Sequence, residues 1–248
     1  MIYNLKIKKN LNLQKKTIVV VFCYNVEKHI YSILNKIKKK NFSQFNFLFI
    51  EDNSKDRTKD ILKIYKNIKN FKIKFNKKNC GFGLNYKYAI QYAIKYKYEK
   101  LIFLHGDNQY PASKIININN NLNYADLCYG SRKLLLNSMK KNMPFLRFIS
   151  NILLTKFINF FLRNNASEYF SGLRGMRVEK LKKINLKKLA NNWIIEQEIH
   201  FIFIKNNYKL REIPITTTYD KDHKSLIPPI KYVSLVILFT LYYFFLKN

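Results

Sequence analysis

Residues 18–25 read IVVVFCYN, and the first six of them, Ile18–Cys23, form an uninterrupted apolar run of the length of a β-strand. A strand that is apolar at every position is expected where helices cover both faces of a parallel sheet. Apolar residues with helical spacing follow directly, between Glu27 and Lys39. This stretch therefore predicts the first strand and the first helix of an α/β domain.

The alternation of strand and helix continues along the chain. Further strands are expected at residues 45–50, 71–75, 101–104 and 125–129, with helices near 61–68 and 86–96. Repeated units of this kind predict an α/β fold with a mostly parallel central sheet and helices on both faces.

The length of 248 residues suits one large α/β domain with its own core. We predict a basic N-terminal extension over residues 1–16, the α/β domain over 17–225 and a C-terminal apolar helix over 226–248. The three cysteines lie far apart without C-x-x-C spacing, which predicts neither a zinc site nor a disulfide framework. The first residues lack the apolar core of a signal peptide, so a cytoplasmic location is expected.

The formal net charge of +31 comes from 46 basic and 15 acidic residues, and only seven of the basic residues are Arg. Such a charge usually indicates a nucleic acid or an anionic membrane as partner. Two explanations stay open: a general bias of composition that places Lys on solvated helix faces, or a surface that attracts membranes. No basic block with interleaved aromatic residues occurs, so we expect no nucleic-acid partner.

Two segments point to a membrane surface. Residues 230–246 are almost entirely apolar, and seventeen residues are at the lower limit for crossing a hydrocarbon core of ~30 Å. This segment is either a membrane-embedded or interfacial helix, or a buried helix that closes the domain. Between residues 144 and 163, polar residues recur every four positions on a broadly apolar helix, which suits either a core helix with one wet edge or a helix against lipid.

Polar clusters follow two of the predicted strands. Residues 51–54 read EDNS, which can be a helix cap or part of a site. His105, Asp107 and Gln109 alternate after the strand at 101–104, so their side chains can point to one side. One carboxylate with neutral partners suits Mg²⁺ or Mn²⁺, whereas a turn that only faces water is the alternative. Neither a G-x-G-x-x-G nor a P-loop motif occurs.

Seven segments in order, spread over residues 17–225, resemble family 2 glycosyltransferases of the GT-A (Rossmann-like) fold. They are close to the branch of dolichol-phosphate (polyprenyl-phosphate) sugar transferases. The segments are IVVVFCYN at 18–25, IEDNSKDRT at 50–58, NCGFG at 79–83, FLHGDNQYP at 103–111, residues 125–132, SGLRGMR at 171–177 and WIIEQE at 193–198.

The resemblance implies site residues at matching positions. Nucleotide-binding residues are Phe22, Tyr24, Glu27, Asp52, Gly81, Gly83 and Arg177, with the Asp52 carboxylate accepting a hydrogen from the base. Asp107, Gln109 and His105 hold the metal, and His105 stands where the family has its first acid. Arg174 and Arg177 lie where the family places basic residues near phosphates, with structural salt bridges as the alternative.

The catalytic residues implied are Asp107, Arg174 and one acid of the 193–198 segment. Glu196 and Glu198 diverge by ~200° on a helix, so only one of them can face the site. We predict Glu198 as the residue that faces the acceptor, acting as a base for a hydroxyl or orienting a lipid phosphate.

The sequence thus predicts an inverting, metal-dependent glycosyltransferase that moves a sugar from a UDP- or GDP-hexose to a polyprenyl phosphate or another membrane-linked acceptor. The expected place is the cytoplasmic face of the cell membrane, in cell-envelope biogenesis. The alternatives are transfer to a glycan hydroxyl in envelope polysaccharide synthesis, a catalytically inactive homologue, and, in another class, a non-catalytic basic nucleic-acid-binding protein.

Overall fold

A seven-stranded sheet with the order β3-β2-β1-β4-β6-β5-β7 forms the centre of the molecule. The computed structural model describes residues 16–134, 145–218 and 229–245. The strands are β1 (Thr17–Cys23), β2 (Asn46–Glu51), β3 (Phe71–Phe75), β4 (Lys100–His105), β5 (Leu127–Ser131), β6 (Arg174–Arg177) and β7 (Leu210–Pro214). Only β6 runs antiparallel to its neighbours β4 and β5. The prediction of a mostly parallel α/β sheet is confirmed.

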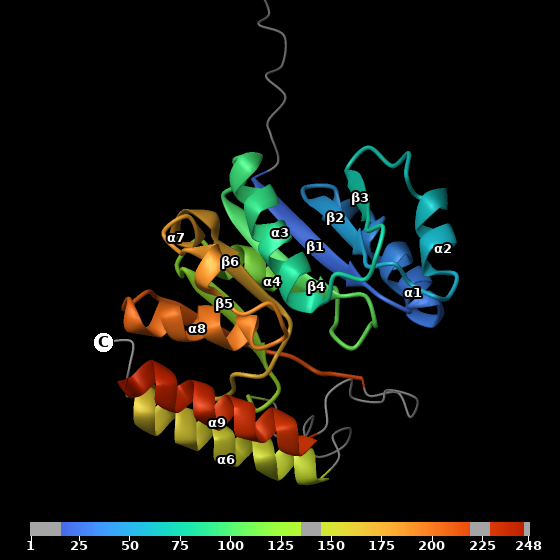
Figure 1. The fold of residues 1–248 in the computed structure, drawn as a ribbon. Helices are drawn as coiled ribbons and strands as arrows, with labels where there is room; N and C mark the ends of the chain where they lie inside the picture. The colour runs from blue at the N-terminus through green and yellow to red at the C-terminus, as the bar shows by residue number, and fades with distance from the viewer. Residues whose placement is uncertain (1–15, 135–144, 219–228, 246–248) are drawn as a thin grey trace, which may run out of the picture.

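Helices cover both faces of this sheet (Figure 1). The helical elements are α1 (Glu27–Ile37), η1 (Lys40–Phe42), α2 (Thr58–Ile64), α3 (Phe82–Lys95), α4 (Lys114–Asn121), α6 (Phe145–Leu162), α7 (Val178–Leu181), η2 (Leu186–Lys188), α8 (Ile195–Lys205) and α9 (Pro229–Phe245). One apolar core contains residues of α1, α2 and α4, and the core on the other face contains residues of α3, α7 and α8.

The run of apolar residues in β1 has a direct explanation in these two cores. Val19 and Val21 belong to the core with α1, whereas Ile18 and Val20 belong to the core with α3. Side chains alternate between the faces of a strand, so a strand that is covered on both faces needs apolar residues throughout.

A third layer lies outside α8, where α6 and α9 run side by side (Figure 1). The middle of the polar stripe of α6 points inward: Thr155 is buried, and the Asn159 side chain donates to the Ala166 carbonyl and accepts from the Ala166 N–H. The outer side is apolar, with Phe160 78% exposed on α6 and Leu238 63% exposed on α9. The helix therefore has apolar residues on both sides, because Leu154 and Ile158 are buried in the core against α8 and α9.

The C-terminal apolar segment is an α-helix, α9, of 17 residues. Val236, Thr240 and Tyr243 are buried. Val236 and Tyr243 belong to a third apolar core, which they share with residues of α6 and α8. In the described part of the chain, none of the helices has both the length and the apolar character needed to cross a membrane. The predicted N-terminal extension falls outside the described residues, apart from Lys16.

We predict that a buried hydrogen bond holds α9 on α8. The Tyr243 hydroxyl donates to Glu198 Oε1 over 3.1 Å. Tyr243→Phe removes a donor from a buried carboxylate and should lower the free energy of unfolding by roughly 1–3 kcal/mol, measured by urea denaturation. Tyr242→Phe, at an exposed position of the same helix, is the control and should change it little. Equal stability of the two variants would contradict this role of the bond.

Candidate functional site

The carboxyl ends of three parallel strands meet at one edge of the sheet. Cys23 is in register with Glu51, and Phe22 with His105. The loops that follow are fixed to β1, because the Asp52 N–H donates to the Cys23 carbonyl over 3.0 Å and the Gly106 N–H donates to the Phe22 carbonyl over 2.8 Å. A Cβ at position 106 would lie 2.6 Å from the Phe22 carbonyl oxygen, so this close approach requires glycine.

A cavity of about 260 Å³ opens at this edge, which we call the strand-end cavity. Its lining comes from the ends of β1, β2 and β4 and from the loop before α3. The lining residues are Phe22, Cys23, Tyr24, Val26, Ile50, Asp52, Asn79, Gly81, Phe82, Asn85, His105, Gly106 and Asp107. Four of the predicted nucleotide-binding residues are thus brought together: Phe22, Tyr24, Asp52 and Gly81. Ligands of open α/β sheets gather at such an edge.

Asp52 shapes the floor of this cavity. Its Oδ1 accepts from the Cys80 N–H (2.8 Å) and from the Asn76 amide (2.7 Å), and its Oδ2 accepts from the Gly81 N–H (2.9 Å). Burial raises the pKa of the Asp52 carboxyl, but these hydrogen bonds outweigh it and lower the pKa below the ordinary value. An ionised Asp52 therefore fixes the 80–81 loop, in which Gly81 has a φ of 81°.

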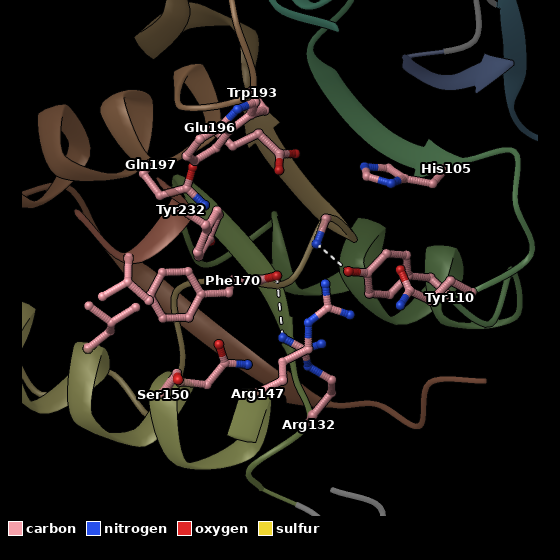
Figure 2. A pocket seen from close by; sticks show the side chains of 15 residues that line it. His105, Tyr110, Arg132, Arg147, Ser150, Phe170, Trp193, Glu196, Gln197 and Tyr232 are labelled. Carbon is pink, nitrogen blue, oxygen red and sulfur yellow. Dashed lines mark hydrogen bonds between the residues drawn. The ribbon is translucent and has the colours of Figure 1, made fainter. Parts of the chain in front are cut away.

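A second cavity, of about 240 Å³, lies between the sheet and the helices α6, α8 and α9; we call it the helix-layer cavity (Figure 2). Its lining residues are His105, Gln109, Tyr110, Arg132, Arg147, Ser150, Asn151, Leu154, Phe170, Gly172, Trp193, Glu196, Gln197, Tyr232 and Val233. In Figure 2, His105 and Glu196 lie toward one end and Arg132, Arg147 and Ser150 toward the other.

His105 lines both cavities and is their common wall. Its Nε2 atom is buried and has no hydrogen-bond partner in the described structure. Its ring packs edge-on against Tyr110, and a Cβ at Gly172 would lie 2.5 Å from Nε2. Tyr110 in turn accepts a hydrogen from the Gly172 N–H over 2.9 Å, which holds this wall in place.

The prediction that Glu198 faces the site is wrong, and Glu196 takes that place. Glu198 accepts from the Ala190 N–H over 2.8 Å and from the Tyr243 hydroxyl, so it joins α8 to α9. Glu196 lines the helix-layer cavity. The two acids do diverge on the helix as expected, but α9 covers the side of α8 that carries Glu198.

Arg174 and Arg177 are not at either cavity. Arg174 is fully buried and donates to the Ser171 and Glu196 carbonyls. Its guanidinium also lies 3.7 Å from the Glu196 carboxylate, so Arg174 forms the structural salt bridge that was the alternative to phosphate binding. Arg177 pairs in register with Lys100 at the start of β4, which places it at the opposite edge of the sheet. The arginines that line the helix-layer cavity are Arg132 and Arg147. The Arg132 Nε donates to Glu168 over 2.7 Å.

Glu27 and Gly83, two further predicted nucleotide residues, also lie outside the strand-end cavity. The Glu27 carboxylate accepts from the Arg57 N–H over 2.8 Å and so fixes the turn before α2. Gly83 touches the segment before α8, where an added Cβ would lie 2.2 Å from the Asn191 carbonyl carbon. Both residues support the loops around the site instead of lining it.

The predicted metal ligands are divided between the cavities. Asp107 lines the strand-end cavity, Gln109 lines the helix-layer cavity, and the Asp107 Oδ1 accepts from the Gln109 N–H over 3.0 Å. Within the described residues, no three His, Cys, Asp or Glu side chains are grouped as a metal site. A single carboxylate such as Asp107 fits a hard cation that takes most of its other ligands from a bound anion and water.

Several lining residues were not singled out from the sequence, namely Tyr110, Arg147, Ser150, Phe170, Gly172 and Tyr232. A usable signal existed for Arg147, because it begins the polar stripe of α6. The others come from separate segments, and only the fold brings them together.

Asp52 supports a prediction with a defined pH dependence. Because folding lowers its pKa, the ionised carboxylate stabilises the folded state above the ordinary value of 3.8, and this contribution is lost as the pH falls through the lowered pKa. The difference in unfolding free energy between wild type and Asp52→Asn should therefore be largest near neutral pH and shrink below 3.8. Asp60→Asn, at a solvent-screened surface position, should show a smaller difference. A difference for Asp52→Asn that is independent of pH would contradict this assignment.

Comparison with known proteins identifies the family of the chain. The model of the family "Glycosyl transferase family 2" matches residues 18–185. An uncharacterized protein of Methanocaldococcus jannaschii is 29% identical over 209 residues, which are 81% of this chain and 81% of that protein.

Solved glycosyltransferases share the fold. S. aureus TarS 1–349 in complex with UDP-GlcNAc superimposes with a TM-score of 0.59 at 18% identity, over 93% of this chain and 68% of that one. Glucosyl-3-phosphoglycerate synthase of Mycobacterium tuberculosis, in complex with Mn²⁺, UDP and phosphoglyceric acid, gives 0.65 at 12% identity, over 92% and 77%. The chain belongs to glycosyl transferase family 2 and has the fold of GT-A glycosyltransferases.

Proposed function

We propose that this glycosyltransferase moves a hexose, with inversion, from a UDP- or GDP-sugar to a polyprenyl phosphate or another membrane-linked acceptor. The observation that carries the proposal is that two cavities share one wall, His105. A transferase needs its donor and its acceptor on opposite sides of one reacting carbon, and two adjoining cavities supply that arrangement.

The strand-end cavity is the proposed nucleotide site. Phe22 and Tyr24 offer aromatic surface, and Asp52 and Gly81 shape its floor. The solved relatives named above were crystallised with UDP-GlcNAc and with UDP, which supports a nucleotide diphosphate here. Asp107 at the rim would hold Mg²⁺ or Mn²⁺, and the bound cation would offset the charge of the departing diphosphate.

The helix-layer cavity is the proposed acceptor site. Arg147 offers a guanidinium group, which suits the planar recognition of phosphate, whereas the guanidinium of Arg132 at the same end is paired with Glu168. The same helices α6 and α9 that line this cavity also carry the exposed apolar side chains of the outer layer, among them Leu153, Phe160 and Leu238. A lipid phosphate could therefore enter the cavity while its chain stays in the adjacent membrane.

The chemistry follows from this placement. The acceptor oxygen attacks the anomeric carbon from the side opposite the diphosphate, the bond from that carbon to the diphosphate oxygen breaks, and the electron pair leaves with the nucleotide. A phosphate acceptor is already ionised and needs no base. The proposed place of action is the cytoplasmic side of a membrane.

A glycan hydroxyl is the second candidate acceptor, because Glu196 places a carboxylate in the same cavity. A hydroxyl must lose its proton, and Glu196 can accept it. Glu196→Gln would abolish transfer to a hydroxyl but largely preserve transfer to a lipid phosphate, so this variant separates the two acceptor classes.

We predict that Asp107→Asn lowers metal-dependent turnover at least 100-fold, because the cation loses its carboxylate ligand. The measurement is Mn²⁺-dependent release of UDP or GDP from a panel of nucleotide sugars, with membrane lipid extract as acceptor. Asp126→Asn, at the opposite edge of the sheet beside Lys180, is the control and should remain active. Wild-type turnover by Asp107→Asn would exclude this metal site.

We also predict that the outer side of α6 and α9 binds lipid. A triple variant, Leu153→Ser with Phe160→Ser and Leu238→Ser, removes exposed apolar surface worth up to about 2 kcal/mol for each side chain. It should no longer sediment with vesicles of phosphatidylcholine and phosphatidylglycerol, whereas the wild type should. Ile64→Ser with Tyr124→Ser, which removes equally exposed apolar residues elsewhere, is the control. Undiminished sedimentation of the triple variant would contradict the membrane surface.

A further inference from the structure

We propose that a third cavity, at the opposite edge of the sheet, binds a small ligand that carries phosphate groups. We call it the basic cavity. Its volume is about 570 Å³, and its lining residues are Asn123, Tyr124, Ala125, Asp126, Arg177, Lys180, Lys209 and Arg211. It shares no lining residue with the strand-end cavity or the helix-layer cavity. A ligand bound here is therefore separate from the proposed sugar donor and acceptor.

The antiparallel direction of β6 places Arg177 at this edge. The parallel strands β5 and β7 begin here, whereas β6 ends here. The backbone joins the three segments, because the Arg177 N–H donates to the Asp126 carbonyl over 2.9 Å and the Asp126 N–H donates to the Lys209 carbonyl over 2.7 Å. Hydrogen bonds of the sheet thus bring cationic residues from distant parts of the sequence around one hollow.

Four cationic side chains line the basic cavity, and Asp126 is the one carboxylate among the lining residues. The Asp126 Oδ2 already accepts from the Lys209 N–H over 2.9 Å, and its Oδ1 lies 3.7 Å from the Lys180 Nζ. Glu179 lies 3.6 Å from the Arg177 Nε and 3.6 Å from the Lys180 Nζ, which is too far for a hydrogen bond. Among the residues that the structure describes, no carboxylate is hydrogen-bonded to any of these four cationic groups.

The contacts of Arg211 leave its charge uncompensated. Its guanidinium lies over the Tyr124 ring, 5.4 Å from the ring centre, and donates to the Asn121 amide oxygen over 3.3 Å. Both partners are neutral, and Tyr124 is itself 68% exposed. A guanidinium held against an aromatic face can still offer N–H groups to an anion in its plane.

The neighbouring Lys100 shows the effect of this positive charge. Lys100 is in register with Arg177, and its Nζ donates to the Asn123 side chain over 2.6 Å. Burial lowers the pKa of the Lys100 ammonium, and the Arg177 guanidinium lowers the pKa further, although Glu99 opposes the shift. An anion in the basic cavity would relieve this repulsion, which favours its binding.

The general richness of the chain in lysine does not account for the basic cavity. Only seven of the 46 basic residues are Arg, and two of these seven line this cavity. The planar guanidinium matches phosphate and carboxylate groups through paired hydrogen bonds. A phosphate group brings up to two charges and three terminal oxygens, so a compact ligand with phosphate groups best matches four cations and one carboxylate. The volume lies within the range of roughly 300–1,000 Å³ that is usual for small-molecule sites.

Calorimetry of the full chain with inorganic pyrophosphate, in metal-free buffer, tests the inference. The double variant Arg177→Gln with Arg211→Gln removes both guanidinium groups and should raise the Kd of pyrophosphate at least about 10-fold. The matched control is Arg57→Gln with Arg163→Gln, which removes two exposed arginines outside the basic cavity and should change the Kd less than about 2-fold.

A single variant guards against loss of the fold. Lys209 is exposed, and its side chain has no partner among the described residues. Lys209→Gln should therefore leave the free energy of unfolding unchanged in urea denaturation, yet raise the Kd of pyrophosphate about 3-fold.

Sedimentation with vesicles of phosphatidylcholine and phosphatidic acid identifies the source of the phosphate. If the Arg177→Gln, Arg211→Gln variant stays in solution while the control variant sediments, the phosphate belongs to a lipid headgroup. If both sediment as the wild type does, the ligand is a free phosphorylated molecule.

Three results would overturn the inference. One is a wild type that does not bind pyrophosphate. Another is equal binding of pyrophosphate by the wild type and by the Arg177→Gln, Arg211→Gln variant, which would place the anion elsewhere. The third is tighter binding of citrate, of a polyglutamate peptide or of single-stranded RNA than of pyrophosphate, lost in the same variant, which would assign the basic cavity to another class of anion.

Discussion

The buried guanidinium of Arg174 holds together the segments that line the helix-layer cavity. It donates to the Ser171 carbonyl, to the Tyr169 carbonyl over 3.3 Å and to the Glu196 carbonyl over 2.9 Å. Burying a charge costs several kcal/mol unless every donor finds an acceptor. The segment before β6 and the first turn of α8 therefore have to stay where Arg174 needs them, and both contribute walls of the helix-layer cavity.

A second constraint connects the two cavities through α3. This helix begins beside Gly81, which lines the strand-end cavity, and its Gly83 allows close contact with the backbone at Asn191. Lys87, one turn further, donates to the Leu189 carbonyl over 2.5 Å and to the Asn191 side chain over 2.7 Å. The loop at the strand-end cavity and the segment that leads into Trp193 and Glu196 are thus parts of one packed unit.

The sequence was sufficient for β1 to β5 and for the polar residues that follow them, because apolar strands and strand-end turns are local patterns. The sequence was insufficient where the position of a side chain depended on a segment far away in the chain. Arg174 and Arg177 lie on a short antiparallel strand, so one is buried behind the cavity and the other reaches the opposite edge of the sheet. Only one of Glu196 and Glu198 could face the site, but which one depended on where α9 packs.

We propose that a nucleotide diphosphate occupies the strand-end cavity and that its sugar points past His105. A crystal structure of the full chain with UDP and Mn²⁺ tests this most directly. We expect the base beside Asp52 and Phe22, and the diphosphate directed toward Asp107 and His105. A base that lies in the helix-layer cavity, or a diphosphate directed away from His105, would contradict the arrangement of donor and acceptor described above.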